Sequence, residues 1–173
     1  GWYRSRFDVN VLAVTGSVGK TTTKEFCHAV LSARYNTLKT EGNLNSDTGL
    51  PLMLFSLMPM HDAAVLEMGM SNAGEIALMS RLARPRAAVI TNIGSSHIES
   101  LKSRENILRA KLEVQEGMPP DGVLVLNGDD DMLSSAAGTL RRPVLWYGFG
   151  SDCDFKAEDV NEDDDGTSFS VRC

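Results

Sequence analysis

The chain has 173 residues, of which 42% are hydrophobic and 23% charged, as expected for one globular domain with its own core. Its formal net charge of −6 argues against a protein that holds nucleic acid through many phosphate contacts, although a few local donors suffice for one nucleotide. Three widely spaced cysteines favour reduced thiols over a disulfide framework, and no apolar run reaches the ~18 residues that span a bilayer.

Apolar runs alternate with helical patterns along most of the chain. The first helical pattern places Phe26, Val30 and Ala33 on one face. In chain order, the patterns predict a strand at 9–15, helices at 21–33 and 47–57, a strand at 63–68, a helix at 73–82, a strand at 87–93, a helix at 103–117, a strand at 123–126, a helix at 132–140 and a strand at 144–147.

The strands lack polar alternation and are separated by helices, which indicates an α/β fold with a mostly parallel sheet covered by helices on both faces. The tail differs from this pattern. Segments 155–160 and 167–171 flank an acidic turn at 161–166, and they predict a small antiparallel hairpin at the C-terminal end.

The strongest motif is a phosphate-binding loop (P-loop) between the first strand and the first helix. Glycines there let successive N–H groups point at phosphate oxygens, and the helix N-terminus adds its partial positive charge. Lys20 is expected to reach the β- and γ-phosphates, and the Thr21 hydroxyl to take a place on Mg²⁺. A glycine turn with an incidental lysine is the alternative, and dinucleotide binding fits poorly because GxGxxG is absent. The ATP-binding residues are predicted to be Gly16, Ser17, Val18, Gly19, Lys20, Thr21 and Thr22.

Two side chains follow buried strands at the edge where open parallel sheets bind ligands. Glu67 ends the strand at 63–68, where a carboxylate is placed to hold Mg²⁺ beside the loop, although it could be an exposed strand-end residue. His97 follows the strand at 87–93 by four residues, and a metal-binding role is weighed evenly there against a structural one.

Lys111 lies in the middle of an apolar helical stripe that contains Ile107, Val114 and Met118. A lysine on a buried face is costly unless it is paired, neutralised or chemically changed. One possibility is that the methylene chain of Lys111 packs in the core while its ammonium group reaches water. The other is that its amine is brought to the phosphates or to a metal. The run of three aspartates at 129–131 precedes a helix, and we expect it to cap that helix rather than bind metal.

Several motifs together resemble the Mur ligase family over about residues 9–170. The run VTGSVGKTTTKE at 14–25 looks like the family's ATP loop, and EGNLNSDTGLP at 41–51 resembles the segment near its muramoyl-peptide substrate. LEMGM at 66–70 is similar to its metal-binding strand end. Two further family blocks match NIGSSHIE at 92–99 and RAKLE at 109–113.

The resemblance implies an ATP-dependent ligase that makes peptidoglycan precursors through an acyl phosphate. The NLN…GLP, EMGM and SHIES…SRENI…AKLE runs are most similar to members that join D-alanyl-D-alanine to UDP-N-acetylmuramoyl-tripeptide. The resemblance also implies that Thr21 and Glu67 bind one Mg²⁺ and that His97 binds a second. It further implies that Lys20, His97 and Lys111 are catalytic residues and that Lys111 is carbamylated by CO₂. Asn43 and Asn45 would contact the nucleotide-sugar peptide.

One departure is Ser46, where many members of the family have an asparagine, and it leaves substrate contacts there open. The family's ligases have three domains, and residues 1–173 correspond to part of the central one, without the N-terminal UDP-binding and C-terminal domains. We expect a cytoplasmic monomer with no nucleic-acid partner and no membrane insertion, and a fragment inactive by itself. Two alternatives are a folylpolyglutamate-type or other Mur-type ligase with a different acceptor, and a module that hydrolyses ATP without ligation.

Overall fold

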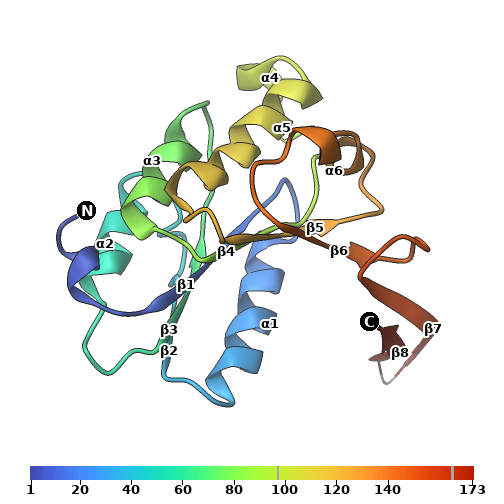
Figure 1. The fold of residues 1–173 in the computed structure, drawn as a ribbon, viewed down its shortest axis with the longest axis horizontal. Coiled ribbons are helices and arrows are strands. Elements are labelled where there is room, and N and C mark those ends of the chain that lie inside the picture. The colour runs from blue at the N-terminus through green and yellow to red at the C-terminus, as the bar shows by residue number, and fades with distance from the viewer. Residues whose placement is uncertain (97, 165) are drawn as a thin grey trace.

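A computed structural model describes residues 1–96, 98–164 and 166–173. Across these residues one sheet has the strand order β2-β3-β1-β4-β5-β6-β7-β8, parallel except for the β7–β8 pair (Figure 1). The predicted mostly parallel sheet with a C-terminal antiparallel hairpin is therefore confirmed. The strands are β1 (Asn10–Thr15), β2 (Thr37–Lys39), β3 (Ala63–Glu67), β4 (Ala87–Ile90), β5 (Val123–Asn127), β6 (Val144–Gly148), β7 (Phe155–Asp163) and β8 (Gly166–Arg172).

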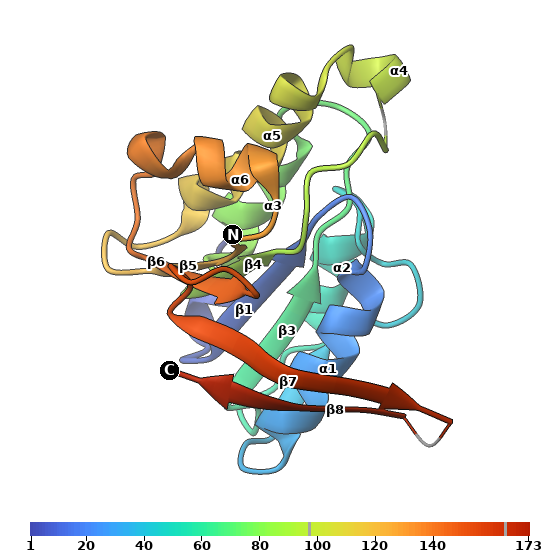
Figure 2. The same ribbon diagram turned by 90° about the vertical axis from the view of Figure 1, so that its right-hand side faces the viewer.

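Helices cover both faces of the sheet, with α1 on one side and α3, α5 and α6 on the other (Figure 1). Figure 2 shows β7 and β8 as a long two-stranded ribbon. The helices are α1 (Lys20–Ser32), α2 (Gly49–Phe55), α3 (Glu75–Ala83), α4 (Ile98–Leu101), α5 (Arg104–Leu112) and α6 (Asp131–Ser135), with 3₁₀ turns at Arg4–Arg6, Glu113–Gly117 and Ala137–Thr139.

The central strand β1 contributes side chains to two separate hydrophobic cores, because successive side chains of a strand point to opposite faces. Val11 and Ala13 join the larger core beneath α2, α3 and α5. Leu12 and Val14 lie on the other face, in a smaller cluster with Cys27 and Leu31 of α1. Burial on both faces explains why the strands read as continuous apolar runs.

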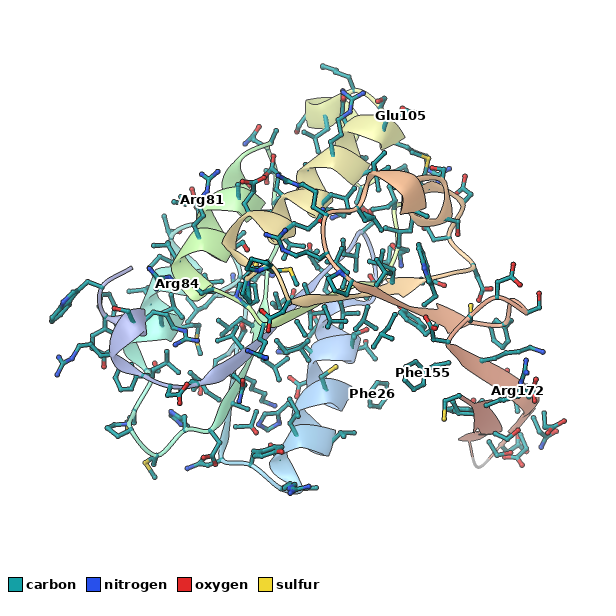
Figure 3. All side chains as sticks on the ribbon, viewed as in Figure 1. Phe26, Arg81, Arg84, Glu105, Phe155 and Arg172 are labelled. Atoms are coloured by element: carbon teal, nitrogen blue, oxygen red, sulfur yellow. The ribbon has the colours of Figure 1, made fainter. Side chains whose placement is uncertain are left out.

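The apolar face that the sequence suggested for α1 is not the face that packs on the sheet. Phe26 is 69% exposed and Val30 74% exposed, and Figure 3 shows Phe26 on the side of the helix toward Phe155 of β7. The packed stripe instead runs through Lys24, Cys27 and Leu31. The lysine in this stripe is accommodated because its Nζ donates to Thr40 O and pairs with Glu25.

Several element boundaries also differ from the expected ones. The strand expected at 87–93 ends at Ile90, and the helices expected at 103–117 and 132–140 end as α-helix at Leu112 and Ser135 and continue as 3₁₀ turns. Strand β7 runs through Asp163 and β8 begins at Gly166, so four of the six residues of the expected acidic turn at 161–166 are paired strand. The sequence patterns did not predict β2, α4 or the turn at Arg4–Arg6, all of which are four residues or shorter.

The strand register brings three carboxyl ends to one point of the sheet edge. Val14 pairs with Glu67 across β1 and β3, and Thr15 pairs with Ile90 across β1 and β4. The segments that follow these strands therefore meet at the same edge, as expected for a ligand site in an open parallel sheet. No helix among the described residues is long and apolar enough to cross a membrane.

Candidate functional site

The loop between β1 and α1 needs glycine at both of its glycine positions. Gly16 has φ of 144°, and a Cβ built on it would lie 1.9 Å from Thr91 Oγ1. Gly19 has φ of 81° at the position just before α1, a left-handed conformation that other residues adopt only with strain. The two glycines therefore permit the tight turn that aims the loop at the helix N-terminus.

The segment after β4 holds the loop from the other side. Ser17 N donates to Asn92 O at 3.0 Å, and Gly94 N donates to Ser17 Oγ at 2.9 Å. The Asn92 side chain contacts Val18 twice, since its Oδ1 accepts from Val18 N at 3.0 Å and its Nδ2 donates to Val18 O at 3.1 Å. Thr91 Oγ1 donates to the same carbonyl at 2.6 Å. The loop is thus shaped before any ligand arrives.

Asn92 was not among the predicted site residues, although it lies in the block at 92–99 that resembles the family. An asparagine just after a buried strand is a common surface residue, and its double contact with Val18 depends on how β4 lies beside β1. The only signal in the sequence was its position at the carboxyl end of a strand next to the loop.

The start of α1 offers unused hydrogen-bond donors. Within the described residues, no partner is recorded for the backbone N–H groups of Gly19, Lys20, Thr21 and Thr22. The first N–H groups of a helix have no intrahelical acceptor and carry its partial positive charge. Lys20 Nζ folds back to Gly16 O at 3.0 Å. The arrangement places one ammonium and several amides in a single turn, which fits phosphate oxygens.

Glu67 lies beside this turn with both carboxylate oxygens engaged. Its Oε2 accepts from Thr21 Oγ1 at 3.0 Å, and its Oε1 accepts from Asn45 Nδ2 at 2.8 Å. The side chain is only 2% exposed. Asn45 is itself held by Gly69 N, which donates to Asn45 O at 2.7 Å. Thr21 and Asn45, two of the predicted site residues, therefore both contact Glu67, which is a third.

The Thr21–Glu67 pair matches the ligand preference of Mg²⁺. A hydroxyl and a carboxylate are hard oxygen donors, and Mg²⁺ typically takes one or two of them together with water and substrate phosphates. The described residues contain no group of three or more His, Cys, Asp or Glu side chains that could hold a metal. A site completed by phosphate and water fits this chain better than a cage made of protein ligands alone.

Lys111 is buried, 2% exposed, among the apolar side chains that the helical stripe predicted. Ile107 and Val114 on the same stripe are fully buried, which confirms that reading of the helix. Burial, with the nearby Lys20 charge as the second cause, lowers the pKa of Lys111 from 10.5 to about 8. A desolvated amine therefore lies close enough to Lys20 to be affected by its charge.

The remaining predicted residues divide into three cases. His97 lies outside the described residues. Asn43 is exposed, and its one hydrogen bond to another described residue is the backbone contact in which Asn45 N donates to Asn43 O at 2.8 Å. Asp130 caps α6 by accepting from Met132 N and Leu133 N, so the capping interpretation of the aspartate run is confirmed.

Ser46, the departure noted in the sequence, supports the start of α2. Its Oγ accepts from Gly49 N at 3.0 Å. A Cβ at Gly49 would lie 2.7 Å from Leu44 Cα, so the loop before α2 is tightly packed. Ser46 thus has a local structural contact.

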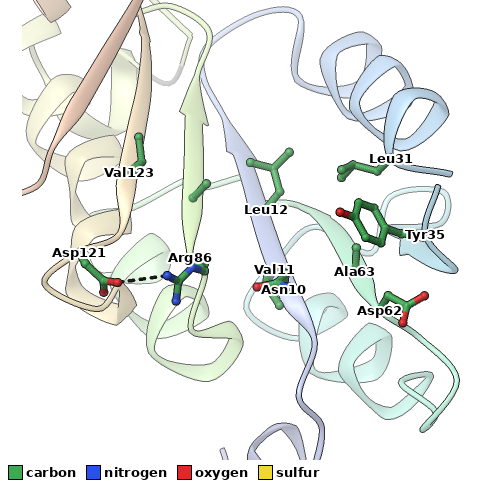
Figure 4. Close-up of a pocket in the computed structure, with 11 residues that line it drawn as sticks. Asn10, Val11, Leu12, Leu31, Tyr35, Asp62, Ala63, Arg86, Asp121 and Val123 are labelled. Atoms are coloured by element: carbon green, nitrogen blue, oxygen red, sulfur yellow. Dashed lines mark hydrogen bonds and ion pairs between the residues drawn. The ribbon is translucent and has the colours of Figure 1, made fainter. Parts of the chain in front are cut away.

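A cavity of about 470 Å³ lies at the opposite end of the strands, as Figure 4 shows. It opens over Leu12, Leu31 and Val123, beside an ion pair between Arg86 and Asp121 at 3.2 Å. Its lining residues come from the amino ends of β1, β3, β4 and β5. None of the predicted site residues lines it, so we place the functional site at the phosphate loop.

Comparison with known proteins agrees with this geometry. Residues 14–172 match the family described as Mur ligase middle domain. The UDP-N-acetylmuramoyl-tripeptide–D-alanyl-D-alanine ligase of Bacillus subtilis (strain 168) is 47% identical over 170 residues, which cover 98% of this chain and 36% of the relative. The ligase of the same name from Escherichia coli (strain K12) is 36% identical over 173 residues, covering 99% and 38%.

Among solved structures, the MurF ligase from Thermotoga maritima in complex with ADP is similar, with a TM-score of 0.89 and 32% identity. The match covers 98% of this chain and 39% of that one. This chain therefore spans little more than a third of the length of the curated relatives it matches.

Proposed function

The chain belongs to the Mur ligase family, and we propose that it is the ATP- and Mg²⁺-binding part of an enzyme that joins D-alanyl-D-alanine to UDP-N-acetylmuramoyl-tripeptide. The observation that carries the proposal is the pairing of Thr21 with Glu67 beside the start of α1, where the N–H groups of residues 19–22 have no partner among the described residues. The names of the relatives support the choice of substrates.

The proposed reaction has two steps. First, the terminal carboxylate oxygen of the tripeptide attacks the γ-phosphorus of ATP, so the bond to the β,γ-bridging oxygen breaks and ADP leaves. The amine of D-alanyl-D-alanine then attacks the acyl phosphate carbon, an amide bond forms, and phosphate departs as the amine loses a proton. Positioning and charge stabilisation are what the protein supplies in phosphoryl transfer.

The loop residues Gly16 to Thr22 would hold the triphosphate, and Lys20 would turn from Gly16 O to the β- and γ-phosphates. Thr21 and Glu67 would hold one Mg²⁺, which when bound neutralises phosphate charge. A second Mg²⁺ near His97 is part of the proposal from the family resemblance. Asn45 would orient Glu67 as well as face the nucleotide-sugar peptide, with Asn43 as its neighbour.

Lys111 is proposed to react with CO₂ and become a carbamate. The nitrogen lone pair bonds to the carbon of CO₂ and one amine proton is lost, which turns a cation into an anion near the metal site. The step needs a neutral amine, and the lowered pKa of about 8 supplies it. An anion there would also relieve the repulsion between Lys111 and Lys20.

The whole-protein context is proposed as well. We propose that residues 1–173 form part of the central domain of a three-domain, cytoplasmic, monomeric ligase, and that other domains seat the uridine end and close over the site. A related ligase with another acceptor shares the same loop, and a module that only hydrolyses ATP does not require Glu67, Asn45 and a buried Lys111 together.

Phosphate release from Mg-ATP by the whole protein, with its flanking domains, tests the proposal. The tripeptide and dipeptide substrates are added separately and together. Release is expected only with both, and Lys20→Ala is expected to lower it by about 10²–10³-fold, the usual effect of losing a transition-state donor. ATP consumption that ignores the substrates, or that needs another acceptor, would overturn the substrate assignment.

A further inference from the structure

Lys24 is a buried lysine that the proposed chemistry does not use. It lies on the packed face of α1 and is 3% exposed. Its Nζ donates to Thr40 O at 2.9 Å and forms an ion pair with Glu25 Oε1 at 2.9 Å. A lysine stem is long enough to carry its charge to water, so an ammonium held inside needs specific partners.

Thr40, the acceptor of that bond, is also in direct contact with Glu67. Thr40 is 1% exposed, and its Oγ1 accepts from Glu67 N at 2.9 Å. Its own N–H donates to Val65 O at 3.0 Å, which continues the β2–β3 pairing. One side of Thr40 thus faces Lys24 and the other fixes the backbone of the proposed metal-binding residue.

Through its position on α1, Lys24 gives this helix a second connection to Glu67, in addition to the one made by Thr21. Lys24 follows Thr21 by three residues, so the two side chains lie on the same side of the helix, one turn apart. Thr21 contacts Glu67 directly, and Lys24 reaches it through Thr40. The helix is therefore tied to the end of β3 at two levels.

Charge balance supports this arrangement. The Lys39 hydrogen bond, followed by that of Lys24, holds the pKa of Glu25 at about 2, so Glu25 stays anionic beside the Lys24 ammonium. Lys24 Nζ therefore has an anionic partner in addition to the Thr40 carbonyl.

We propose that Lys24 is a positioning residue for the metal site: by holding Thr40 it sets the distance between the Thr21 hydroxyl and the Glu67 carboxylate. The inference rests on the proposed function, since it assumes that these two groups bind Mg²⁺. Partners behind the metal ligands typically change metal affinity or activity by 10–100-fold when removed.

The test measures divalent metal binding in the whole protein. Electron paramagnetic resonance gives the dissociation constant for Mn²⁺ in the presence of ADP, and phosphate release gives the Mg²⁺ concentration for half-maximal rate. Lys24→Met is expected to raise both by about 10-fold, with the KM for D-alanyl-D-alanine changed less than about twofold. Lys24→Arg, which keeps a charged donor, is expected to recover most of the loss.

Two further variants separate positioning from general stability. Lys156→Met is the control, because it removes a lysine of the β7–β8 hairpin whose ion pair is with Glu158, and it is expected to change neither constant. Thr40→Val keeps the volume of the side chain but removes the hydroxyl that accepts from Glu67 N, so it is expected to weaken metal binding. This variant still tests the inference if Lys24→Met does not fold.

Each outcome has a definite meaning. If Glu67→Gln weakens Mn²⁺ binding but Lys24→Met and Thr40→Val lower only the melting temperature, the positioning role is overturned and the metal site stands. If Glu67→Gln itself leaves Mn²⁺ binding unchanged, the proposed metal site fails and the inference fails with it.

Discussion

The Thr21 hydroxyl donates to Glu67 Oε2 at 3.0 Å, across 46 positions of sequence. The contact joins the first turn of α1 to the carboxyl end of β3, and it depends on the parallel register that places Glu67 beside Val14. In the proposed metal site, Mg²⁺ is expected to replace this hydrogen bond with one contact to the Thr21 hydroxyl and one to the Glu67 carboxylate.

Thr21→Val removes the hydroxyl while keeping the shape of the side chain. The Mg²⁺ concentration for half-maximal phosphate release is expected to rise by about 10-fold or more, because one of two protein oxygens is lost. Thr23→Val is the matched control, since no side-chain hydrogen bond is recorded for Thr23 among the described residues. Equal effects of the two substitutions would show that Thr21 is not a ligand.

Gly16→Ala is expected to weaken nucleotide binding by about 5- to 150-fold. The new Cβ would meet Thr91 Oγ1 at 1.9 Å in a backbone conformation with φ of 144°, so the loop must shift. Strain of this kind costs about 1–3 kcal/mol, and calorimetric titration with ATP measures the loss of binding. Gly138→Ala is the control, because no atom lies within 4 Å of its Cβ. Normal ATP affinity in Gly16→Ala would contradict the loop geometry.

Asn92→Asp tests whether the two contacts between the Asn92 side chain and Val18 hold the phosphate loop in place. The carboxylate oxygen that replaces Nδ2 would face Val18 O, where the amide now donates at 3.1 Å. We expect the KM for ATP to rise by about 10-fold, as the cost of one hydrogen bond turned into a repulsion is about 1.5–3 kcal/mol. Asn161→Asp, in the hairpin, makes the same chemical change far from the loop. A KM for ATP that matches this control would remove Asn92 from the site.

The chemistry proposed for Lys111 predicts a pH dependence. With a pKa of about 8 instead of 10.5, the neutral amine fraction increases between pH 7 and 9, where ordinary lysines remain almost fully protonated. Carbamate formation from ¹³C-bicarbonate, followed by ¹³C NMR, is therefore expected to rise over that range. Lys111→Met is expected to lack the signal, and its persistence in that variant would assign the carbamate to another amine.

Much of this architecture could be predicted because it depends on local pattern. The strand, glycine loop and helix around Lys20 follow from residues adjacent in the chain, and so does the burial of Lys111, which a helical repeat of 3.6 residues places among Ile107 and Val114. Glu67 was found because a strand end in a parallel sheet is a defined place.

Short elements and competing faces were not predictable in the same way. Strand β2 has three residues and exists through its pairing with β3, which local propensity does not encode. Helix α1 carries two stripes that could pack, and the more apolar one, with Phe26 and Val30, is the exposed one.

By itself, the sequence determined the fold class, the phosphate loop and the positions of charged residues at the ends of buried strands or on buried helical faces. Each of these depends on neighbouring residues or on the regular repeat of a helix or strand. The tertiary structure alone decided which of those groups meet. Asn92 reaches Val18 over 74 positions, Asn45 reaches Glu67 over 22, and Lys24 reaches Thr40 over 16. The physical reason is strand order: β3 and β4 flank β1, and contacts across a parallel sheet join segments that no local pattern relates.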